Sequence, residues 1–539
     1  MSEVAATTGQ LRVRAEAPTG RVVDLSELLD EQRVISAEVI RCLCVGPEAK
    51  SVDPRGISIR GAHVVDRLDL SYCEVPHPLS FSATTFEFAP DLRWAQLPGL
   101  AIRDGCSLPG LQAEGLRLDH DLQLIACKVD GIVKLLGARI GGQLNCVDAI
   151  LTNEGGSALD ADSAEINGHV FFRGGFRATG TVRLLGAKTG GQLACERATL
   201  SNEGGLALDA DSSEINGSTF LRDGFNATGT VRLLAAKIGG QLNCEGATLT
   251  NEGGDALDAE RAEIDGHVLL RNGFRATGTV RLVGAKIGGG LALADATLAR
   301  AGDALDARDA VIGSAIRFAN VRVTGGIDLF RASATTLEDD LGSGESRLGS
   351  WSLVQRLVLD GFTYARFGHD AEWGARLRAK WLKSTTGFQQ GAWQQLISVY
   401  RAQGRDEDAT TAAIAMHKDR IKRARLPRYR RWGRLVLGAT VGHGYRPWLA
   451  GIWAVLVIAA FALFVWHWSG MFVPAKQDVT GPQPIGYAAD VFLPIVDLGQ
   501  ADDWQPTGWV RWVNWGVILL GWALTTIFVA GFTRIVRSE

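Results

Sequence analysis

The chain has 539 residues, enough for several modules, and its formal net charge at pH 7 is −3. So small a net charge excludes a general attraction to nucleic acid, and we expect no nucleic-acid partner. All eight cysteines lie between Cys42 and Cys244 and form no C-x-x-C pair. We therefore expect reduced thiols packed as small hydrophobic groups, and no metal or other cofactor.

The N-terminal region, residues 1–55, is predicted to be a tail followed by a capping helix. Residues 1–20 lack the apolar run of a signal peptide and are expected to be mobile. Residues 24–45 carry apolar side chains at helical spacing. We expect an amphipathic helix there, because the open end of a repetitive sheet needs a cover.

Residues 56–365 are predicted to form a β-solenoid, in which the chain winds into stacked coils. Within 129–330 the sequence repeats every 49 residues. Two columns of identical residues mark this repeat: Asn153, Asn202, Asn251 and Gly180, Gly229, Gly278. Apolar residues alternate with polar ones between glycine-containing corners at about every twelfth position, which is typical of short strands with one buried face.

The number of residues in one coil is a multiple of about twelve, and we favour about 24, because a smaller coil would enclose almost no core. Each 49-residue repeat then forms two coils, and its equivalent positions lie about 9.6 Å apart along the axis. We expect about eleven or twelve coils, starting near Ile57 and ending at residues 353–362. Residues 72–125 contain five prolines and are predicted to form irregular loops.

Residues 366–435 are predicted to be a helical connector. Trp393, Leu396, Tyr400, Gly404 and Ala409 resemble the first half of a tetratricopeptide-type helix pair. A helical hairpin that caps the solenoid is favoured over a peptide-binding site. The connector ends in a basic segment, from which we expect six side chains to contact anionic lipid head groups: Lys422, Arg423, Arg425, Arg428, Arg430 and Arg431.

The C-terminal region, residues 436–539, is predicted to contain two transmembrane helices. Residues 447–472 and 512–535 are apolar runs long enough to span a bilayer, with tryptophans near their ends. The basic segment precedes the first run, and the loop 473–508 between them is acidic. The positive-inside rule therefore predicts a multi-pass protein of the inner or cytoplasmic membrane with both chain ends and the solenoid in the cytoplasm.

The solenoid repeats its charges in columns. One is basic: Lys134, Arg183, Arg232 and Arg281. A second is acidic: Asp160, Asp209, Asp258 and Asp306. A third consists of Arg173, Arg222 and Arg271. The basic column is a candidate binding ladder for an anionic polymer or an acidic partner. We favour the alternative that these are the polar, outward positions that any soluble solenoid has.

Motifs of enzymes are missing. The sequence has no P-loop, no G-x-G-x-x-G after a strand, no H-E-x-x-H and no nucleophile elbow. His169 and His267 occupy equivalent repeat positions with Ser218 between them, which argues against a required ligand. We expect no catalytic site.

The loop between the predicted spans contains an apolar segment, residues 487–500, too short to cross a bilayer and suited to an interfacial or re-entrant position. Two spans with such a segment are the minimal topology of a pore-loop channel, although the T-x-G-Y-G filter is absent. An anchor hairpin is favoured over a pore. The candidate pore residues are Phe492, Pro494, Asp497, Gly499, Asn514, Thr525 and Thr526.

Four motifs carry a resemblance: A-A-K-I-G-G-Q-L-N-C (235–244), W-Q-Q-L-I-S-V-Y-R-A-Q-G (393–404), G-H-G-Y-R-P-W (442–448) and D-V-F-L-P-I-V-D-L-G-Q (490–500). The chain resembles uncharacterised bacterial membrane proteins, familiar from actinobacteria, with a cytoplasmic β-solenoid and two C-terminal transmembrane helices. It is distantly similar to pentapeptide-repeat proteins with a two-span channel domain. Members of such families are sometimes labelled membrane-associated oxidoreductases, but the sequence offers no redox cofactor site.

The expected architecture is thus an all-β solenoid with helical caps and a two-helix transmembrane hairpin. The expected function is that of a membrane-anchored, non-enzymatic recognition or scaffold protein. Its partners would be the lipid bilayer and a cytoplasmic protein, and a homo-oligomer is compatible with this interpretation. The alternative is an oligomeric ion channel or membrane-permeabilising effector gated by the solenoid. A membrane-associated oxidoreductase is a remote third alternative.

Overall fold

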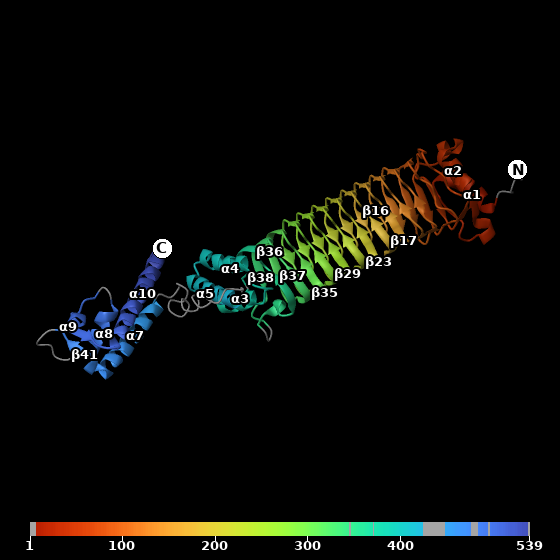
Figure 1. Cartoon of the computed structure of the whole chain (residues 1–539). Coiled ribbons are helices and arrows are strands. Elements are labelled where there is room, and N and C mark those ends of the chain that lie inside the picture. Colours follow the sequence, from red (N-terminus) through yellow and green to blue (C-terminus); the bar gives the residue numbers. More distant parts are fainter. Residues whose placement is uncertain are drawn as a thin grey trace. The chain divides into compact units, whose positions relative to one another are not determined.

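The computed structural model in Figure 1 describes residues 7–343, 347–369, 371–423, 448–475, 483–493 and 496–536. The chain divides into two compact units, residues 1–403 and 404–539. The first unit is a β-solenoid of about 12 coils with about 23 residues in each, as the alternation of apolar residues predicts.

Parallel strands of the solenoid stack into two long sheets. The first sheet contains β1 (Val22–Asp24), β3 (Ile57–Arg60), β5 (Leu79–Ser82), β7 (Gln96–Leu97), β8 (Leu100–Arg103), β11 (Arg117–Leu118), β12 (Leu122–Ile125), β15 (Arg139–Ile140), β16 (Leu144–Asn145), β18 (Glu165–Ile166), β19 (Val170–Phe171), β21 (Lys188–Thr189), β22 (Leu193–Ala194), β24 (Glu214–Ile215), β25 (Thr219–Phe220), β27 (Lys237–Ile238), β28 (Leu242–Asn243), β30 (Glu263–Ile264), β31 (Val268–Leu269), β33 (Lys286–Ile287), β34 (Leu291–Ala292), β36 (Val311–Phe318), β38 (Ser333–Asp339) and β40 (Thr363–Phe367).

The second sheet forms another face of the same coils. It contains β2 (Val34–Ser36), β4 (His63–Val65), β6 (Thr85–Phe86), β9 (Ser107–Leu108), β10 (Leu111–Gln112), β13 (Lys128–Asp130), β14 (Val133–Lys134), β17 (Ile150–Asp160), β20 (Arg177–Arg183), β23 (Thr199–Asp209), β26 (Asn226–Arg232), β29 (Thr248–Asp258), β32 (Arg275–Arg281), β35 (Thr297–Asp306), β37 (Arg322–Asp328) and β39 (Val354–Val358).

Successive coils differ in length, and this difference explains the 49-residue repeat. Leu144 pairs with Val170 across a longer coil, and Val170 pairs with Leu193 across a shorter one. One long coil and one short coil therefore make one sequence repeat. Equivalent residues of successive repeats lie two coils apart, with one intervening coil between them.

The thiols of the repeat point into the core, as expected. Cys146, Cys195 and Cys244 are buried and are not joined in disulfides. Burial raises the pKa of the Cys244 thiol to about 12, so this group stays protonated at neutral pH. The strand register places Leu221 and Leu270 beside it in the flanking coils, and both are buried. Cys244 thus fills the space of a small hydrophobic side chain.

The prediction of irregular loops at residues 72–125 is wrong. Strands β5 to β12 continue the stack there, with Leu79 paired to Leu100 and Leu100 to Leu122. These coils are shorter than those of the repeat, so they do not copy its pattern. Pro78 immediately precedes β5 and Pro98 immediately follows β7, outside the strand ladders where a missing N–H would matter.

The N-terminal prediction is also partly wrong. Helix α1 (Thr8–Glu16) lies in the predicted tail and begins with a capping box between Thr7 and Gln10. Within 24–45, only α2 (Ala37–Val45) is α-helical, because the Ser36 hydroxyl caps its first turn and Val34–Ser36 forms β2. Strands β1 and β2 pair with β3 and β4, so the first coil begins before Ile57.

The C-terminal end of the solenoid carries helices α3 (Ala375–Lys383) and α4 (Gln390–Ala402). Trp393, Leu396 and Tyr400 are buried, and α4 packs against β40. The Tyr400 hydroxyl donates a hydrogen bond to the backbone oxygen of Trp373 at 2.7 Å. These contacts make α3 and α4 a cover for the last coil.

The second unit contains α5 (Asp406–Arg423), α7 (Trp448–His467), β41 (Phe472–Pro474), α8 (Pro484–Phe492), α9 (Gln500–Asp503), β42 (Trp504–Pro506) and α10 (Val510–Val536). Strands β41 and β42 form an antiparallel ribbon. Helices α7, α8 and α10 contact one another. We call residues 448–536 the C-terminal helical module.

One helix in the described ranges is long and apolar enough to cross a membrane, the stretch Leu449–His467 of α7. The first predicted span, 447–472, therefore ends earlier than expected, because a 3₁₀ turn (Ser469–Met471) and β41 follow the helix. The second predicted span, 512–535, falls within α10, part of whose side chains lies outside the described residues. Its transmembrane character stays a prediction.

Candidate functional site

The predicted basic ladder lies on the second sheet, where it forms half of a mixed column. The strand register pairs Lys134 with Asp160, Asp160 with Arg183, and Arg183 with Asp209. The same register continues through Arg232, Asp258, Arg281 and Asp306. The basic and acidic columns of the sequence are thus one column of alternating charge. Equivalent residues of successive repeats skip a coil, and the skipped coil supplies the opposite charge.

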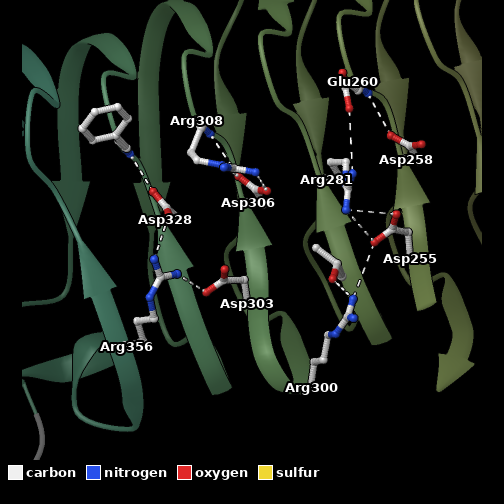
Figure 2. A network of polar contacts seen from close by, with 12 residues as sticks. Asp255, Asp258, Glu260, Arg281, Arg300, Asp303, Asp306, Arg308, Asp328 and Arg356 are labelled. Carbon is white, nitrogen blue, oxygen red and sulfur yellow. Dashed lines mark hydrogen bonds and ion pairs between the residues drawn. The ribbon is translucent and has the colours of Figure 1, made fainter. Parts of the chain in front are cut away.

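Carboxylates of neighbouring coils pair with every member of the basic ladder. Arg183 lies 2.5 Å from Asp162, Arg232 2.6 Å from Asp211, Arg281 3.4 Å from Asp255 and Lys134 3.7 Å from Glu114. Figure 2 shows the Arg281 guanidinium between Asp255 and Glu260 and, downstream, Arg356 between Asp303 and Asp328. Arg308 pairs with Asp306, two residues away in the same coil. The ladder is therefore no continuous cationic surface, which removes the basis for an anionic polymer as its ligand.

Acidic groups outnumber basic ones around this column. Arg232 lies within 3.4 Å of Asp209 and 2.6 Å of Asp211, so one guanidinium serves two carboxylates. Burial raises the pKa of the Asp211 carboxyl above its ordinary value, and the neighbouring Asp209 raises it further. Burial and Asp160 have the same effect on the pKa of Asp162.

We expect Asp211→Asn to become more stable relative to the wild type as pH rises from below to well above the ordinary aspartate pKa of about 3.9. The folded-state pKa of Asp211 is raised, so its protonated form favours folding, and that contribution is lost when the carboxyl ionises. Asparagine cannot ionise, and its side-chain oxygen can still accept the hydrogen bond that the Leu234 N–H donates to Asp211 at 3.1 Å. Urea unfolding of both proteins across this pH range measures the difference. A difference that is constant or falls with pH contradicts the prediction.

Two more columns of alternating charge lie on the first sheet. One runs Glu165, Lys188, Glu214, Lys237, Glu263, Lys286. The other runs Arg173, Glu196, Arg222, Glu245, Arg271, next to the paired strands β19 to β31. Lys286 lies 2.7 Å from Glu263, and Arg271 lies 2.6 Å from Glu245. The sequence analysis found the arginines of the second column but missed their glutamate partners. The 49-residue repeat compares every second coil, and the glutamates lie in the coils between.

The repeated histidines have a structural role at one corner of the coil. The Nδ1 atom of His169 accepts a hydrogen bond from the Gln192 N–H at 3.0 Å, and that of His267 accepts from Gly290 at 2.8 Å. Between them, the Ser218 hydroxyl accepts from the Gln241 N–H at 3.2 Å. The column therefore needs a hydrogen-bond acceptor for the next coil, which either residue type supplies.

Accordingly, His267→Ala should lower the free energy of unfolding by about 1 kcal/mol, because the Gly290 N–H loses its acceptor. His267→Ser should stay close to the wild type, since Ser218 performs this role in the adjacent repeat. Denaturant unfolding of the three proteins tests the pair. Equal losses in the two variants would mean that packing of the imidazole, and not the hydrogen bond, matters.

The candidate pore residues are divided between a packed core and an exposed loop. Phe492, at the end of α8, is 1% exposed, and Asn514 of α10 is 8% exposed. The Tyr487 hydroxyl donates to the Asn514 side-chain oxygen at 3.2 Å. Gly521 of α10 lies so close to α8 that an added Cβ would be 2.0 Å from the Phe492 backbone oxygen. Helix α8 is thus packed tightly against α10.

Of the other pore candidates, Asp497 is exposed and accepts a hydrogen bond from the Gly499 N–H at 2.9 Å within their loop. Thr526 is exposed and donates to the Trp522 backbone oxygen at 2.7 Å, whereas Thr525 is half-buried. Pro494 lies outside the described residues. The described candidates do not gather on one surface of the single chain.

Of the candidate membrane-surface residues, Lys422 and Arg423 end helix α5, and Arg423 pairs with Asp419 at 2.9 Å. Arg425, Arg428, Arg430 and Arg431 lie outside the described residues.

Among the residues that the structure describes, no three His, Cys, Asp or Glu side chains form a group that could hold a metal ion. Comparison of the chain with protein-family models, curated proteins and solved structures gives no match.

Proposed function

We propose that the protein is a non-enzymatic scaffold, in which the C-terminal helical module anchors a cytoplasmic β-solenoid to the membrane. The observation that carries this proposal is the apolar surface of the module. Large apolar side chains of α7 and α10 are exposed in the folded chain: Val455, Leu456, Leu463, Leu519, Leu520 and Trp522. Soluble proteins rarely leave so many neighbouring apolar side chains in water, whereas lipid would cover them.

In this proposal residues 447–472 and 512–535 cross the inner or cytoplasmic membrane, and both chain ends and the solenoid lie in the cytoplasm. Exposed tryptophans support the placement of one helix end at the lipid head groups: Trp466 lies next to the last residue of α7, and Trp512 and Trp515 lie near the start of α10. The basic segment at 418–434 would contact anionic lipid at the opposite membrane surface.

The module supports an anchor better than a pore. Tyr487, Ala488 and Phe492 of α8 are buried in the core of the module, next to α7 and α10. Two candidate pore residues, Phe492 and Asn514, are thus engaged in packing within one copy. The solenoid contributes a regular surface whose charges are paired between coils, a property suited to a rigid scaffold.

Cysteine labelling tests the anchor and its orientation. Ile485→Cys lies in the outward loop of this proposal and Tyr72→Cys on the solenoid, and the two native side chains are 74% and 76% exposed. A membrane-impermeant maleimide should label the cysteine at 485 in spheroplasts and the cysteine at 72 only after the membrane is permeabilised. Release of the protein by carbonate wash, or equal labelling at both positions, would refute the topology. The channel would be favoured instead if the full chain conducted ions across liposome membranes and Asp497→Asn abolished that ion flux.

A further inference from the structure

Three repeats carry a four-residue bulge in the second sheet. The bulges cover residues 153–156, 202–205 and 251–254, each with the sequence N-E-G-G. In the first, the register passes from the Thr152–Thr179 pair to the Ser157–Thr181 pair, so the bulge has no partner residues in the next coil. The asparagine side chain closes each bulge by donating to the backbone oxygen four residues later, at 2.8, 3.0 and 2.9 Å.

The asparagines also reach back toward the preceding bulge, but only as far as a threonine. Asn202 Nδ2 lies 2.9 Å from Thr181 Oγ1, and Asn251 Nδ2 lies 2.9 Å from Thr230 Oγ1. Each threonine belongs to the coil between two bulges. Beyond the equivalent Thr279 of the fourth repeat, the space is bordered by the backbone oxygens of Gly253 and Gly254.

The fourth repeat shows what this space accepts, because Arg300 replaces the asparagine there. Its guanidinium contacts Thr279 Oγ1, the equivalent threonine, and extends further to the backbone oxygens of Gly254 at 2.8 Å and Gly253 at 3.2 Å. It also lies 3.5 Å from the Asp255 carboxylate (Figure 2). A guanidinium thus fits between one bulge and the next.

Two upstream positions have the same backbone without the arginine, and Ser157 and Leu206 stand there in place of Asp255. The first, formed by Gly155, Gly156 and Thr181, ends at Asn202, and the second, formed by Gly204, Gly205 and Thr230, ends at Asn251. No side-chain donor from the described part of the chain reaches these glycine oxygens. We call the two positions the cation notches. Exposed carboxylates at the bulge tips, Glu154 and Glu203, add negative charge beside them.

We propose that the cation notches bind arginine side chains of a protein partner. A guanidinium is planar, weakly hydrated and rich in N–H donors, so it suits a pair of backbone oxygens better than a compact, strongly hydrated ammonium does. The notches lie two coils apart, about 9.6 Å along the solenoid, so two arginines of one basic segment can occupy both. This proposal rests on the scaffold function and names the chemistry of the partner, whereas the membrane anchor is independent of it.

The test measures binding of a fluorescently labelled hexa-arginine peptide to the full chain in detergent micelles by fluorescence anisotropy. In the double variant Asn202→Arg/Asn251→Arg the chain's own arginines should fill both notches, as Arg300 does in the fourth repeat. We expect it to bind the peptide at least about tenfold more weakly, the loss that follows when charge-assisted hydrogen bonds are removed. Arg300→Asn should open a third notch and raise affinity or stoichiometry.

A charge-matched control separates the notches from general electrostatics. Thr199→Arg/Thr248→Arg adds the same two charges on the same strands, at positions where the flanking coils carry Arg177 and Arg275. This control should bind hexa-arginine within about twofold of the wild type, since its arginines lie outside the notches.

The proposal is overturned if the wild type does not bind hexa-arginine, if the control loses as much affinity as the notch variant, or if hexalysine binds as tightly. If any of these outcomes occurred while the labelling still supported the membrane topology, the notch proposal would be rejected and the anchor proposal would stand. If the protein were released from membranes by the carbonate wash but still bound hexa-arginine, the anchor proposal would be rejected and the notch proposal would stand.

Discussion

Replacement of Arg378 by alanine is expected to lower the free energy of unfolding of the solenoid by about 3–5 kcal/mol. Arg378 of α3 forms an ion pair with Asp339 of β38, and both side chains are 0% exposed. Its two terminal nitrogens donate to the two carboxylate oxygens at 2.7 and 2.8 Å. The variant would leave the Asp339 charge buried without its partner, and this, rather than the loss of attraction, is the main penalty.

The surroundings of this pair explain why the chain tolerates a buried arginine. Its Nε donates to the Glu372 backbone oxygen at 2.6 Å, and its guanidinium lies 3.9 Å from the centre of the Phe367 ring. The Trp351 indole N–H donates to Asp339 at 3.0 Å. The pair therefore joins α3 to one of the last strands of the first sheet, so its loss should loosen the cover of the solenoid end.

Chemical denaturation of the full chain in detergent, followed by near-UV circular dichroism, measures the effect. Arg317→Ala is the matched control, because Arg317 and Glu338 form an ion pair one residue from Asp339 in the sequence, with the arginine 51% exposed. The Arg317→Ala variant should lose less than about 1 kcal/mol of the free energy of unfolding. Arg378→Met with Asp339→Leu should recover much of the stability, since an apolar pair leaves no buried charge. Equal losses at Arg378 and Arg317 would contradict the argument.

The solenoid was predictable because its signals are local. Alternation of apolar residues and glycine corners indicates a strand and a turn wherever they occur, and the repeated copies make the pattern unambiguous. The coils at 72–125 lack such copies, so their prolines misled the prediction, although Pro78 and Pro98 lie outside the strand ladders. Residues 24–45 were misassigned because the spacing of Val34 and Ile35 fits a helix as well as an edge strand.

The pairing of opposite charges between neighbouring coils could not be predicted from the sequence. Columns read from the repeat contain only every second coil, and the partners of Arg183 in the two flanking coils lie at unequal distances along the chain. Only the register unites the columns. The Arg378–Asp339 pair has no sequence signal, because an arginine on an amphipathic helix ordinarily lies at the surface. Arg300 is different, since its departure from the asparagine column was visible in the sequence and acquired meaning only from the bulge geometry.

Gly229→Ala is expected to lower the free energy of unfolding by about 3–5 kcal/mol, because two separate penalties add at this position. Its backbone has φ +112°, a conformation that residues with a Cβ rarely adopt. A Cβ would also lie 2.4 Å from the backbone oxygen of Asn202 and 2.9 Å from that of Gly205, both in the bulge of the preceding coil. Neither oxygen belongs to a flexible side chain, so the coils themselves would have to separate.

Gly204→Ala separates the two penalties. Gly204 lies in the same bulge with φ +70°, but a Cβ there meets no atom within 4 Å. Only the backbone penalty remains, and we expect a loss of about 1–2 kcal/mol. Denaturation of both variants under the same conditions measures the difference, which combines the close approach of adjacent coils at Gly229 with the larger backbone strain of φ +112° compared with +70°. Equal losses would mean that the glycine column is retained for its φ angle alone.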